Sequence, residues 1–256
     1  MPPAADPRPP LDAARLAPLG VEVLPRAGST NALVADRARA GEPEGLVLVT
    51  EHQTAGRGRL DRTWETPDRA ALTFSLLLRP TRPAEEWPWL PLLAGVAVAA
   101  ALRDHGVPAE LKWPNDVLLD GDKTAGILAE RLETGAGPAA VLGIGLNVTT
   151  TREELPTAAA TSVLLATGGA PDRTELLATI LTRLRGAYDA WSAGGSATLR
   201  AAYREACTTV GREVRVQMPG GDDLTGRVTD VDGAGRLVVA GTPVAAGDVV
   251  HVRPAG

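Results

Sequence analysis

The sequence predicts an α+β fold, in which a mixed β-sheet domain flanked by helices is followed by a small C-terminal β-barrel. Over roughly the first 208 residues, β-favouring runs are interspersed with helical runs, which is typical of a sheet covered by helices. From Gly211 onward, short β-favouring runs alternate with Gly/Asp turns, as in a small barrel. Hydrophobic residues make up 44% of the 256-residue chain, which is enough for a buried core.

Local signals place the elements of the large domain in order. Ser29 or Thr30 can cap a helix that runs through Arg39 and that Gly41 closes. Apolar residues at helical spacing predict a helix over Trp87–Asp104. Strands are predicted at Val21–Leu24, Leu46–Thr50, Ala71–Leu78, Glu110–Trp113, Val117–Leu119, Gly126–Arg131 and Ala140–Asn147, and further helices at Thr174–Trp191 and Ala197–Cys207.

Changes in composition predict three segments. Residues 1–18 are proline-rich and are expected to form a flexible lead-in. Residues 19–208 carry the alternating elements. Residues 209–256 carry the predicted barrel, whose strands are expected at Glu213–Gln217, Leu224–Val231, Leu237–Val239 and Val249–Val252.

Charge and composition exclude several classes of protein. The 26 basic and 31 acidic side chains give a net charge of −5, which argues against a dedicated nucleic-acid binder. A single cysteine, Cys207, cannot form an internal disulfide, and the three histidines lack metal-ligand spacing. The longest uncharged run, Trp87–Leu102, contains two prolines and is shorter than the ~20 residues that a membrane span needs. We expect a soluble, cytoplasmic protein without a signal peptide.

Rare residue types indicate candidates for function. Arginine replaces lysine almost everywhere, so Lys112 and Lys123 stand out as compact point charges. The chain has three asparagines, Asn31, Asn115 and Asn147, each of which offers both a donor and an acceptor.

The segment from Gln53 to Trp64 is rich in glycine and arginine. Gly56 and Gly58 free the backbone to fold over a ligand. Three arginines, Arg57, Arg59 and Arg62, are spaced to meet phosphate or carboxylate groups, and Trp64 can supply a face for a purine or another ring. The alternative is an exposed, solvated loop or an Arg-Gly contact to nucleic acid.

A second segment, Lys112-Trp-Pro-Asn115-Asp116, precedes Lys123 and Gly126. A proline after Trp113 favours extended backbone, so the polar side chains emerge at a strand end. A hairpin turn at residues 120–122 would bring Lys123 back toward Asp116. A cation, an amide and a carboxylate would then converge, although an ordinary hairpin with one surface ion pair gives the same pattern.

Two shorter segments are ambiguous by themselves. Ser29, Thr30 and Asn31 either cap a helix or bind a small polar ligand at its start. The glycines of Gly143-Ile-Gly145-Leu-Asn147 mark either the close approach of a ligand or a crowded core. His52, His105 and His251 have no partner nearby in the sequence and are expected to have no role.

Taken in order, these four segments resemble the biotin–protein ligases over residues 28–148, and the tail resembles the SH3-like barrel of that family. The resemblance implies a class II synthetase-like fold. In place of a family glycine the loop has Asp61. The chain has no room for a DNA-binding winged helix before Ser29, so it resembles the monofunctional kind.

The resemblance implies the enzyme biotin–[biotin carboxyl-carrier protein] ligase, with ATP, biotin and Mg²⁺ as its small-molecule requirements. Biotin and ATP form biotinyl-5′-AMP and pyrophosphate, and a lysine of a carrier domain then takes the biotin. The loop is interpreted as a lid over the intermediate. The implied catalytic residues are Lys123, Arg59 and Asp116, where Asp116 can orient phosphates directly or through Mg²⁺, or act as a base. The implied binding residues are Ser29, Thr30, Asn31, Gln53, Gly56, Arg57, Gly58, Arg59, Arg62, Trp64, Lys112, Asn115, Lys123, Gly126, Gly145 and Asn147.

Two other functions stay open at this point. A lipoate–protein ligase or octanoyl transferase is expected to share the fold but lacks the Gly-Arg-Gly-Arg pattern. A non-catalytic adaptor would use the barrel as its binding module. The expected partner is the biotin carboxyl carrier domain of an acyl-CoA or pyruvate carboxylase, without nucleic acid or membrane, and the chain is expected to be a monomer or a weak homodimer.

Overall fold

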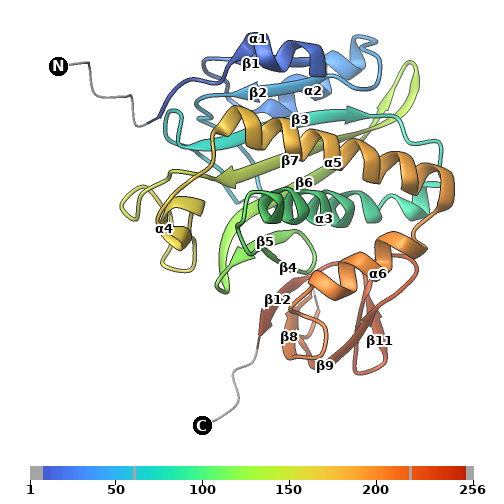
Figure 1. Ribbon diagram of the computed structural model, residues 1–256. Coiled ribbons are helices and arrows are strands. Elements are labelled where there is room, and N and C mark those ends of the chain that lie inside the picture. The colour runs from blue at the N-terminus through green and yellow to red at the C-terminus, as the bar shows by residue number, and fades with distance from the viewer. Residues whose placement is uncertain (1–7, 60–61, 219–220, 252–256) are drawn as a thin grey trace.

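The computed structural model describes residues 8–59, 62–218 and 221–251, which form two sheets connected by helices (Figure 1). The larger sheet has seven strands in the order β1-β2-β3-β7-β6-β5-β4. Their bounds are β1 Val21–Leu24, β2 Val47–Thr50, β3 Ala71–Leu78, β4 Glu110–Lys112, β5 Asp116–Leu119, β6 Asp122–Thr134 and β7 Gly137–Asn147. β1 pairs with β2 in parallel and the other pairs are antiparallel, so the predicted mixed sheet is confirmed.

The two faces of this sheet have different coverings. On one face, α3 (Trp89–Asp104) and α5 (Arg173–Gly194) lie over β3, β7 and β6, with Phe74 and Ile144 among the buried side chains (Figure 1). On the other face, α2 (Thr30–Arg39) packs on Leu77 and Val141. Because side chains alternate along a strand, Thr73 and Ser75 of β3 share the α2 face. A strip of that face beyond α2 is therefore polar.

The remaining helices connect these layers. Among the described residues they are α1 (Ala13–Leu16), η1 (Ala17–Leu19), η2 (Ala84–Glu86), α4 (Val163–Thr167) and α6 (Ala197–Ala206). Of these, α6 lies between the large sheet and the second sheet (Figure 1). Within the described part of the chain, no helix is both long enough and apolar enough to cross a bilayer.

The second sheet forms the C-terminal barrel and packs firmly on the large domain. Its strands, in the order β11-β10-β9-β8-β12, are β8 Glu213–Gln217, β9 Leu224–Val231, β10 Leu237–Val239, β11 Thr242–Val244 and β12 Asp248–His251. Two indole nitrogens reach across the junction: Trp89 donates to the Gly233 carbonyl at 2.8 Å, and Trp113 donates to the Gly235 carbonyl at 3.1 Å. The barrel valines also belong to the same apolar cluster as α3.

The expectation of a flexible lead-in is wrong for residues 8–18, while residues 1–7 lie outside the described part of the chain. Leu11 and Leu16 are buried, and the backbone N–H of Leu11 donates to Glu51 Oε1 at 2.6 Å. Glu51 also accepts from Arg173 at 2.7 Å, and Arg173 donates to the Pro9 carbonyl at 2.7 Å. These bonds hold residues 8–18 on the large domain. The sequence alone does not reveal them, because the bonded residues come from three distant segments.

Removing one partner of this buried ion pair should destabilise the fold. The side chains of Arg173 and Glu51 are 6% and 8% exposed, so Glu51→Gln leaves a buried, uncompensated charge. We expect the free energy of unfolding in urea to fall by about 3 kcal/mol. The matched control is Glu175→Gln, which removes an ion pair to Arg15 whose side chains are each 56% exposed, and it should cost no more than about 1 kcal/mol. Equal losses for the two variants would contradict the anchoring role.

The junction between barrel and sheet also contains His251, whose ring nitrogen Nε2 lies 3.2 Å from Thr209 Oγ1. Burial lowers the pKa of His251 to about 4, helped by the positive charges of Lys112 and Arg212. The unfolded chain takes up this proton near pH 6.5, whereas the folded chain does so only near pH 4. The stability of the fold should therefore fall as the pH is lowered through that window.

We expect an NMR titration of the His251 ring to show a pKa well below its ordinary value, with the resonance assigned through His251→Gln. That variant should also lose part of the decrease in stability between pH 6.5 and 4. A midpoint near 6.5 in the folded protein would contradict the buried position of the ring.

Candidate active site

Glycines leave a strip of the large sheet bare, and two side chains lie on it. In the register of β3, β7 and β6, Ser75 faces Gly143, Thr73 faces Gly145, and Gly126 faces Gly145 from the other side. A Cβ at Gly143 would collide with the Asn31 amide, and one at Gly145 with the Trp64 indole. The paired glycines thus mark the close approach of α2 and of the Gly/Arg segment to the sheet.

A buried network of hydroxyl and amide side chains lies at the N-terminus of α2, and the carboxylate of Glu130 borders it. The Ser75 hydroxyl lies 2.6 Å from Asn31 Oδ1, to which it donates, and 2.7 Å from Thr30 Oγ1. The Thr30 backbone N–H donates to Gln53 Oε1 at 3.0 Å. Asn31 Nδ2 donates to Glu130 Oε2 at 2.6 Å. These side chains hold donors and acceptors in fixed positions without a cation among them.

We call residues 53–59 and 62–66 the Gly/Arg arm; Asp61, which replaces a family glycine, lies outside the described residues. Bridges between Gln53 and Thr66 and between Arg57 and Thr63 fold the arm back on itself. Gln53 Nε2 donates to the Trp64 carbonyl at 3.1 Å. A Cβ at Gly56 would collide with both groups of that bond, so glycine is required there, whereas one at Gly58 would meet its nearest neighbour at 3.4 Å.

The three arginines of the arm contact three different parts of the protein. Arg57 pairs with Glu130 of β6 at 3.2 Å. Arg59 donates to Asn115 Oδ1 at 3.3 Å and to the carbonyl oxygen of Gly247 in the barrel at 3.4 Å. Arg62 pairs with Asp248, also in the barrel. Burial lowers the pKa of Arg59, and the charges of Asp248 and Asp116 oppose that effect.

The hairpin of β5 and β6 brings Lys123 to Asp116, as the spacing predicts. Lys123 Nζ lies 2.6 Å from Asp116 Oδ1 and 5.6 Å from the centre of the Trp64 ring. A Cβ at Gly126 would lie 3.2 Å from Lys123 Nζ and from the Trp64 ring. Nearby, Trp64 Nε1 and Thr73 Oγ1 are buried without a hydrogen-bond partner. Unpartnered polar atoms on a bare strip beside a cation indicate a place for a polar ligand.

Three of the predicted residues bond to other protein groups in this structure, and a fourth, Lys112, lies at the barrel junction. Ser29 caps α2, because its Oγ accepts from the Ala32 N–H at 3.4 Å. Asn115 Nδ2 donates to the Ile127 carbonyl at 2.9 Å, and Asn147 Nδ2 donates to the Thr161 carbonyl at 3.0 Å. Lys112 lies opposite Asp116 in the register of β4 and β5, at the barrel junction. Ser29 thus lies at the end of α2 that carries the polar network, and Asn115 and Lys112 lie next to Asp116, the partner of Lys123.

The described residues contain no group of three or more His, Cys, Asp or Glu side chains that could hold a metal ion. Asp116, the predicted Mg²⁺ neighbour, is paired with Lys123. The donor set thus does not fit a metal held by protein ligands alone.

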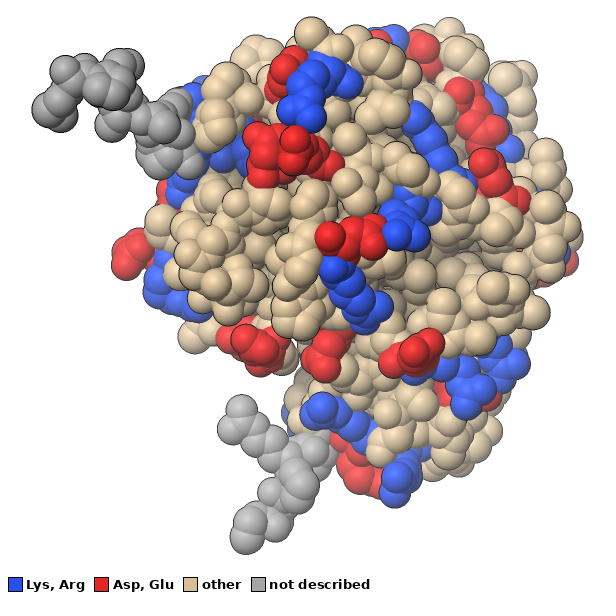
Figure 2. Space-filling view, in the orientation of Figure 1, with Lys and Arg blue, Asp and Glu red and all other residues tan. Residues whose placement is uncertain are grey.

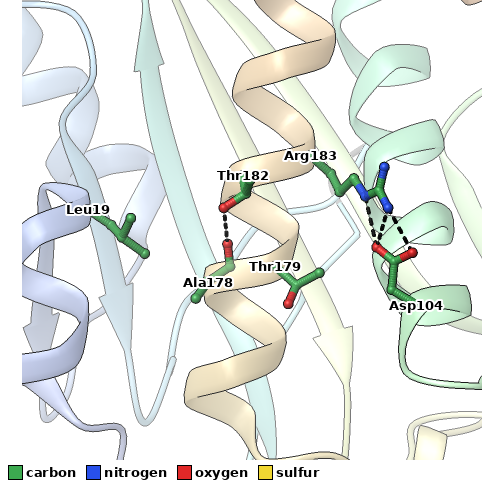
Figure 3. Close-up of a pocket in the computed structure, with 6 residues that line it drawn as sticks. All are labelled: Leu19, Asp104, Ala178, Thr179, Thr182 and Arg183. Carbon is green, nitrogen blue, oxygen red and sulfur yellow. Dashed lines mark hydrogen bonds and ion pairs between the residues drawn. The ribbon is translucent and has the colours of Figure 1, made fainter.

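A separate hollow between α3, α5 and η1 lies on the helical side of the sheet (Figure 3). Its polar groups are already paired: Arg183 with Asp104 at 2.8 Å, and Thr182 with the Ala178 carbonyl at 2.8 Å. Nothing there resembles the unpartnered atoms beside Gly145. Figure 2 shows acidic and basic side chains intermixed over this side of the molecule. The candidate site is therefore the bare strip under the Gly/Arg arm.

Comparisons with known proteins identify the family to which the chain belongs. Residues 23–147 match the biotin/lipoate A/B protein ligase family, and residues 209–252 match the biotin protein ligase C-terminal domain. The chain is 44% identical to the biotin–[acetyl-CoA-carboxylase] ligase of Mycobacterium tuberculosis, over 91% of this chain and 89% of that protein. The chain belongs to the biotin protein ligase family.

Two further members of the family have lower sequence identity to this chain. The bifunctional ligase/repressor BirA of Bacillus subtilis is 32% identical over 82% of this chain and 66% of its own length. A biotin protein ligase from Aquifex aeolicus, solved in complex with biotin and ATP, has a TM-score of 0.78 and 28% identity, over 91% of this chain and 99% of that one.

The sequence alone did not identify several residues of the candidate site. Thr73 and Ser75 stand two apart in an otherwise apolar strand, and that spacing is the signal that could have found them. Glu130, which accepts from both Asn31 and Arg57, sits in an ordinary charged stretch. Asp248 is 186 residues away from Arg62, so no local pattern connects them.

The close approach of Trp64 to Gly145 gives a test of the site. Gly145→Ala places a methyl group inside the indole, and we expect it to lower the free energy of unfolding by about 1–3 kcal/mol. In a Trp64→Ala background the same substitution should cost far less, because the collision is gone. Gly135→Ala, with no neighbour within 4 Å, is the control and should change stability by no more than about 0.5 kcal/mol. Equal costs with and without Trp64 would refute the packing.

Proposed function

We propose that this chain is an ATP-dependent biotin–protein ligase, which makes biotinyl-5′-AMP and transfers the biotin to a lysine of a carrier domain. The observation that carries the proposal is the position of Lys123 beside the Trp64 indole, whose Nε1 is buried without a partner. A second unpartnered atom, Thr73 Oγ1, lies across Gly145, and a network of polar side chains lies at the other end of the same glycine strip. The names of the M. tuberculosis relative and of the A. aeolicus complex support the same activity.

The polar network suits the ureido ring of biotin. That ring is neutral and carries both N–H donors and a carbonyl acceptor. Thr30, Asn31, Gln53 and Ser75 offer hydroxyl and amide groups that are held by one another. A site of this kind favours a substrate that makes all of these hydrogen bonds, because a poorer substrate leaves buried polar groups unpaired.

Adenylation must bring the biotin carboxylate against the α-phosphate of ATP. A carboxylate oxygen forms a bond to the α-phosphorus while the bond to the β-phosphate breaks, and pyrophosphate leaves. In our proposal, Lys123 meets the carboxylate and the α-phosphate, Arg57 and Arg59 offset the remaining negative charge, and Trp64 faces the adenylate. Mg²⁺ enters bound to the nucleotide as part of the substrate, since the described protein groups do not fit a metal site of their own.

The second step needs an acceptor lysine amine without its proton. The amine nitrogen attacks the acyl carbon, the bond between that carbon and the phosphate oxygen breaks, and AMP leaves. When Lys123 moves toward the phosphate, Asp116 Oδ1 loses its 2.6 Å partner and becomes free to accept a proton. Asp116 is thus the proposed base in this step. The Gly/Arg arm lies over the strip and excludes water from the reactive anhydride until the acceptor docks.

The proposed acceptor is the biotin carboxyl carrier domain of an acetyl-CoA or related carboxylase, and the proposed compartment is the cytoplasm. The test is exchange of labelled pyrophosphate into ATP, followed by mass spectrometry of a carrier domain. Exchange that depends on biotin, together with a single biotinyl addition, supports the proposal. Exchange that depends on lipoate instead, or no exchange with either acid, would overturn it.

Lysine at position 123 should be required even though the charge could be kept. The tip of Lys123 lies close enough to Gly126 that a Cβ there would come within 3.2 Å of it and of the Trp64 ring. The wider guanidinium of Lys123→Arg would be crowded at this point and could not place a single point charge in the same position. We expect biotin-dependent pyrophosphate exchange to slow by at least about 100-fold. Arg131→Lys, a swap of cations on the same strand at an exposed pair with Glu133, is the control and should leave exchange unchanged. Exchange within a factor of about two of wild type for Lys123→Arg would dismiss the role.

A further inference from the structure

The C-terminal barrel contacts the Gly/Arg arm at two points. Arg62 pairs with Asp248, the first residue of β12, and Arg59 donates to the carbonyl oxygen of Gly247 at 3.4 Å. The side chain of Asp248 is 20% exposed, whereas that of Arg62 is 64% exposed. A carboxylate of the barrel thus holds an exposed cation of the arm.

The barrel backbone is built so that these two groups face the arm. Gly247 has a φ of 154°, and a Cβ there would lie 3.0 Å from the Gln217 carbonyl and would collide or crowd against neighbouring β8 atoms. The turn into β12 can follow β8 this closely because position 247 has no side chain. From β12 onward the register is fixed, with Asp248 opposite Gln217. The carbonyl and the carboxylate are therefore presented by a rigid part of the barrel.

The same carboxylate also acts on Arg59. Burial lowers the pKa of Arg59. The negative charge of Asp248 opposes this effect more strongly than that of Asp116 does. Arg59 also donates to Asn115, one residue before Asp116. A substitution at Asp248 would therefore alter the position of Arg59, and through its bond to Asn115 the position of Asp116 and its partner Lys123.

We propose that Asp248 is a positioning residue of the barrel, which sets the Gly/Arg arm over the active site through Arg62 and Arg59. Asp248 itself touches neither substrate; it acts by holding the arm. The consequence for the reaction, slower loss of biotinyl-5′-AMP, rests on the proposed function, whereas the holding of the arm does not. The large domain alone would accordingly have an incompletely positioned site.

Hydrogen exchange on the full-length protein without ligands tests the holding. In Asp248→Asn and in Arg62→Gln, amides of residues 53–59 and 62–66 should exchange roughly three- to tenfold faster than in wild type. The double variant should show little further increase, since each change breaks the same pair. The matched control is Asp223→Asn, which removes a barrel carboxylate paired with Arg215 at 3.6 Å and should leave the arm unchanged.

Two results would overturn the proposal. The first is unchanged exchange of the arm in both single variants. The second is faster exchange of the arm in Asp248→Asn accompanied by equal loss of protection in β8 and β9, with no effect of Arg62→Gln, since the barrel would then simply have loosened. Arg62→Gln lies outside the barrel, so its result decides the question even if Asp248→Asn folds poorly.

A second readout separates this proposal from the proposed function. Purified biotinyl-5′-AMP bound to Asp248→Asn should be released roughly three- to tenfold faster, with little change in the rate of the chemical step. If wild type fails to bind biotinyl-5′-AMP, the proposed function fails and the exchange result still stands. If wild type binds it and Asp248→Asn releases it at the wild-type rate, the positioning role fails and the function stands.

Discussion

The bare glycine strip is the constraint on which the site depends. Gly143 and Gly145 of β7, with Gly126 of β6, leave the face of a packed sheet without side chains at the point where polar chemistry is needed. Asn31 arrives there from α2, and Trp64 arrives from the Gly/Arg arm. Asn31 occupies the space that a side chain at position 143 would fill, and Trp64 occupies the space that a side chain at position 145 would fill. The rigid sheet thus provides a surface, and two separate segments provide the groups that a ligand meets.

Electrostatics explains how so many cations can be kept beside this strip before an anion binds. Three of them have a carboxylate partner: Arg57 has Glu130, Arg62 has Asp248, and Lys123 has Asp116. These carboxylates offset the repulsion between the like charges, and in the proposed reaction they keep the cations in place for the polyphosphate of ATP. In the proposed reaction a phosphate group replaces Asp116 as the partner of Lys123, while the pair of Arg62 and Asp248 stays in place and holds the arm. Preorganised charge of this kind stabilises a transition state because little reorganisation remains to be made.

What the sequence could predict follows from the distance between partners along the chain. The pair of Lys123 and Asp116 can be predicted from the sequence, because a tight turn at residues 120–122 brings their strands side by side. The bonds that hold residues 8–18 on the large domain cannot be predicted in this way, because Glu51, Arg173 and Pro9 are far apart in the sequence and meet only in the folded domain. Ser75 falls in between, since its polarity in an apolar strand is visible but its partners depend on the register of β3 and the position of α2.

The segment from Lys112 to Asp116 shows why the barrel and the sheet must be treated as one site. Trp113 faces the barrel, where its indole donates to Gly235 and its backbone N–H to Thr209. Two residues later, Asn115 faces the arm and accepts from Arg59. Such a short segment cannot absorb a shift of the barrel without moving Asn115. The barrel therefore constrains the site through two sets of contacts, those of the segment from Trp113 to Asn115 and those of β12 with the Gly/Arg arm. The geometry around Lys123 thus depends on the contact between the two domains.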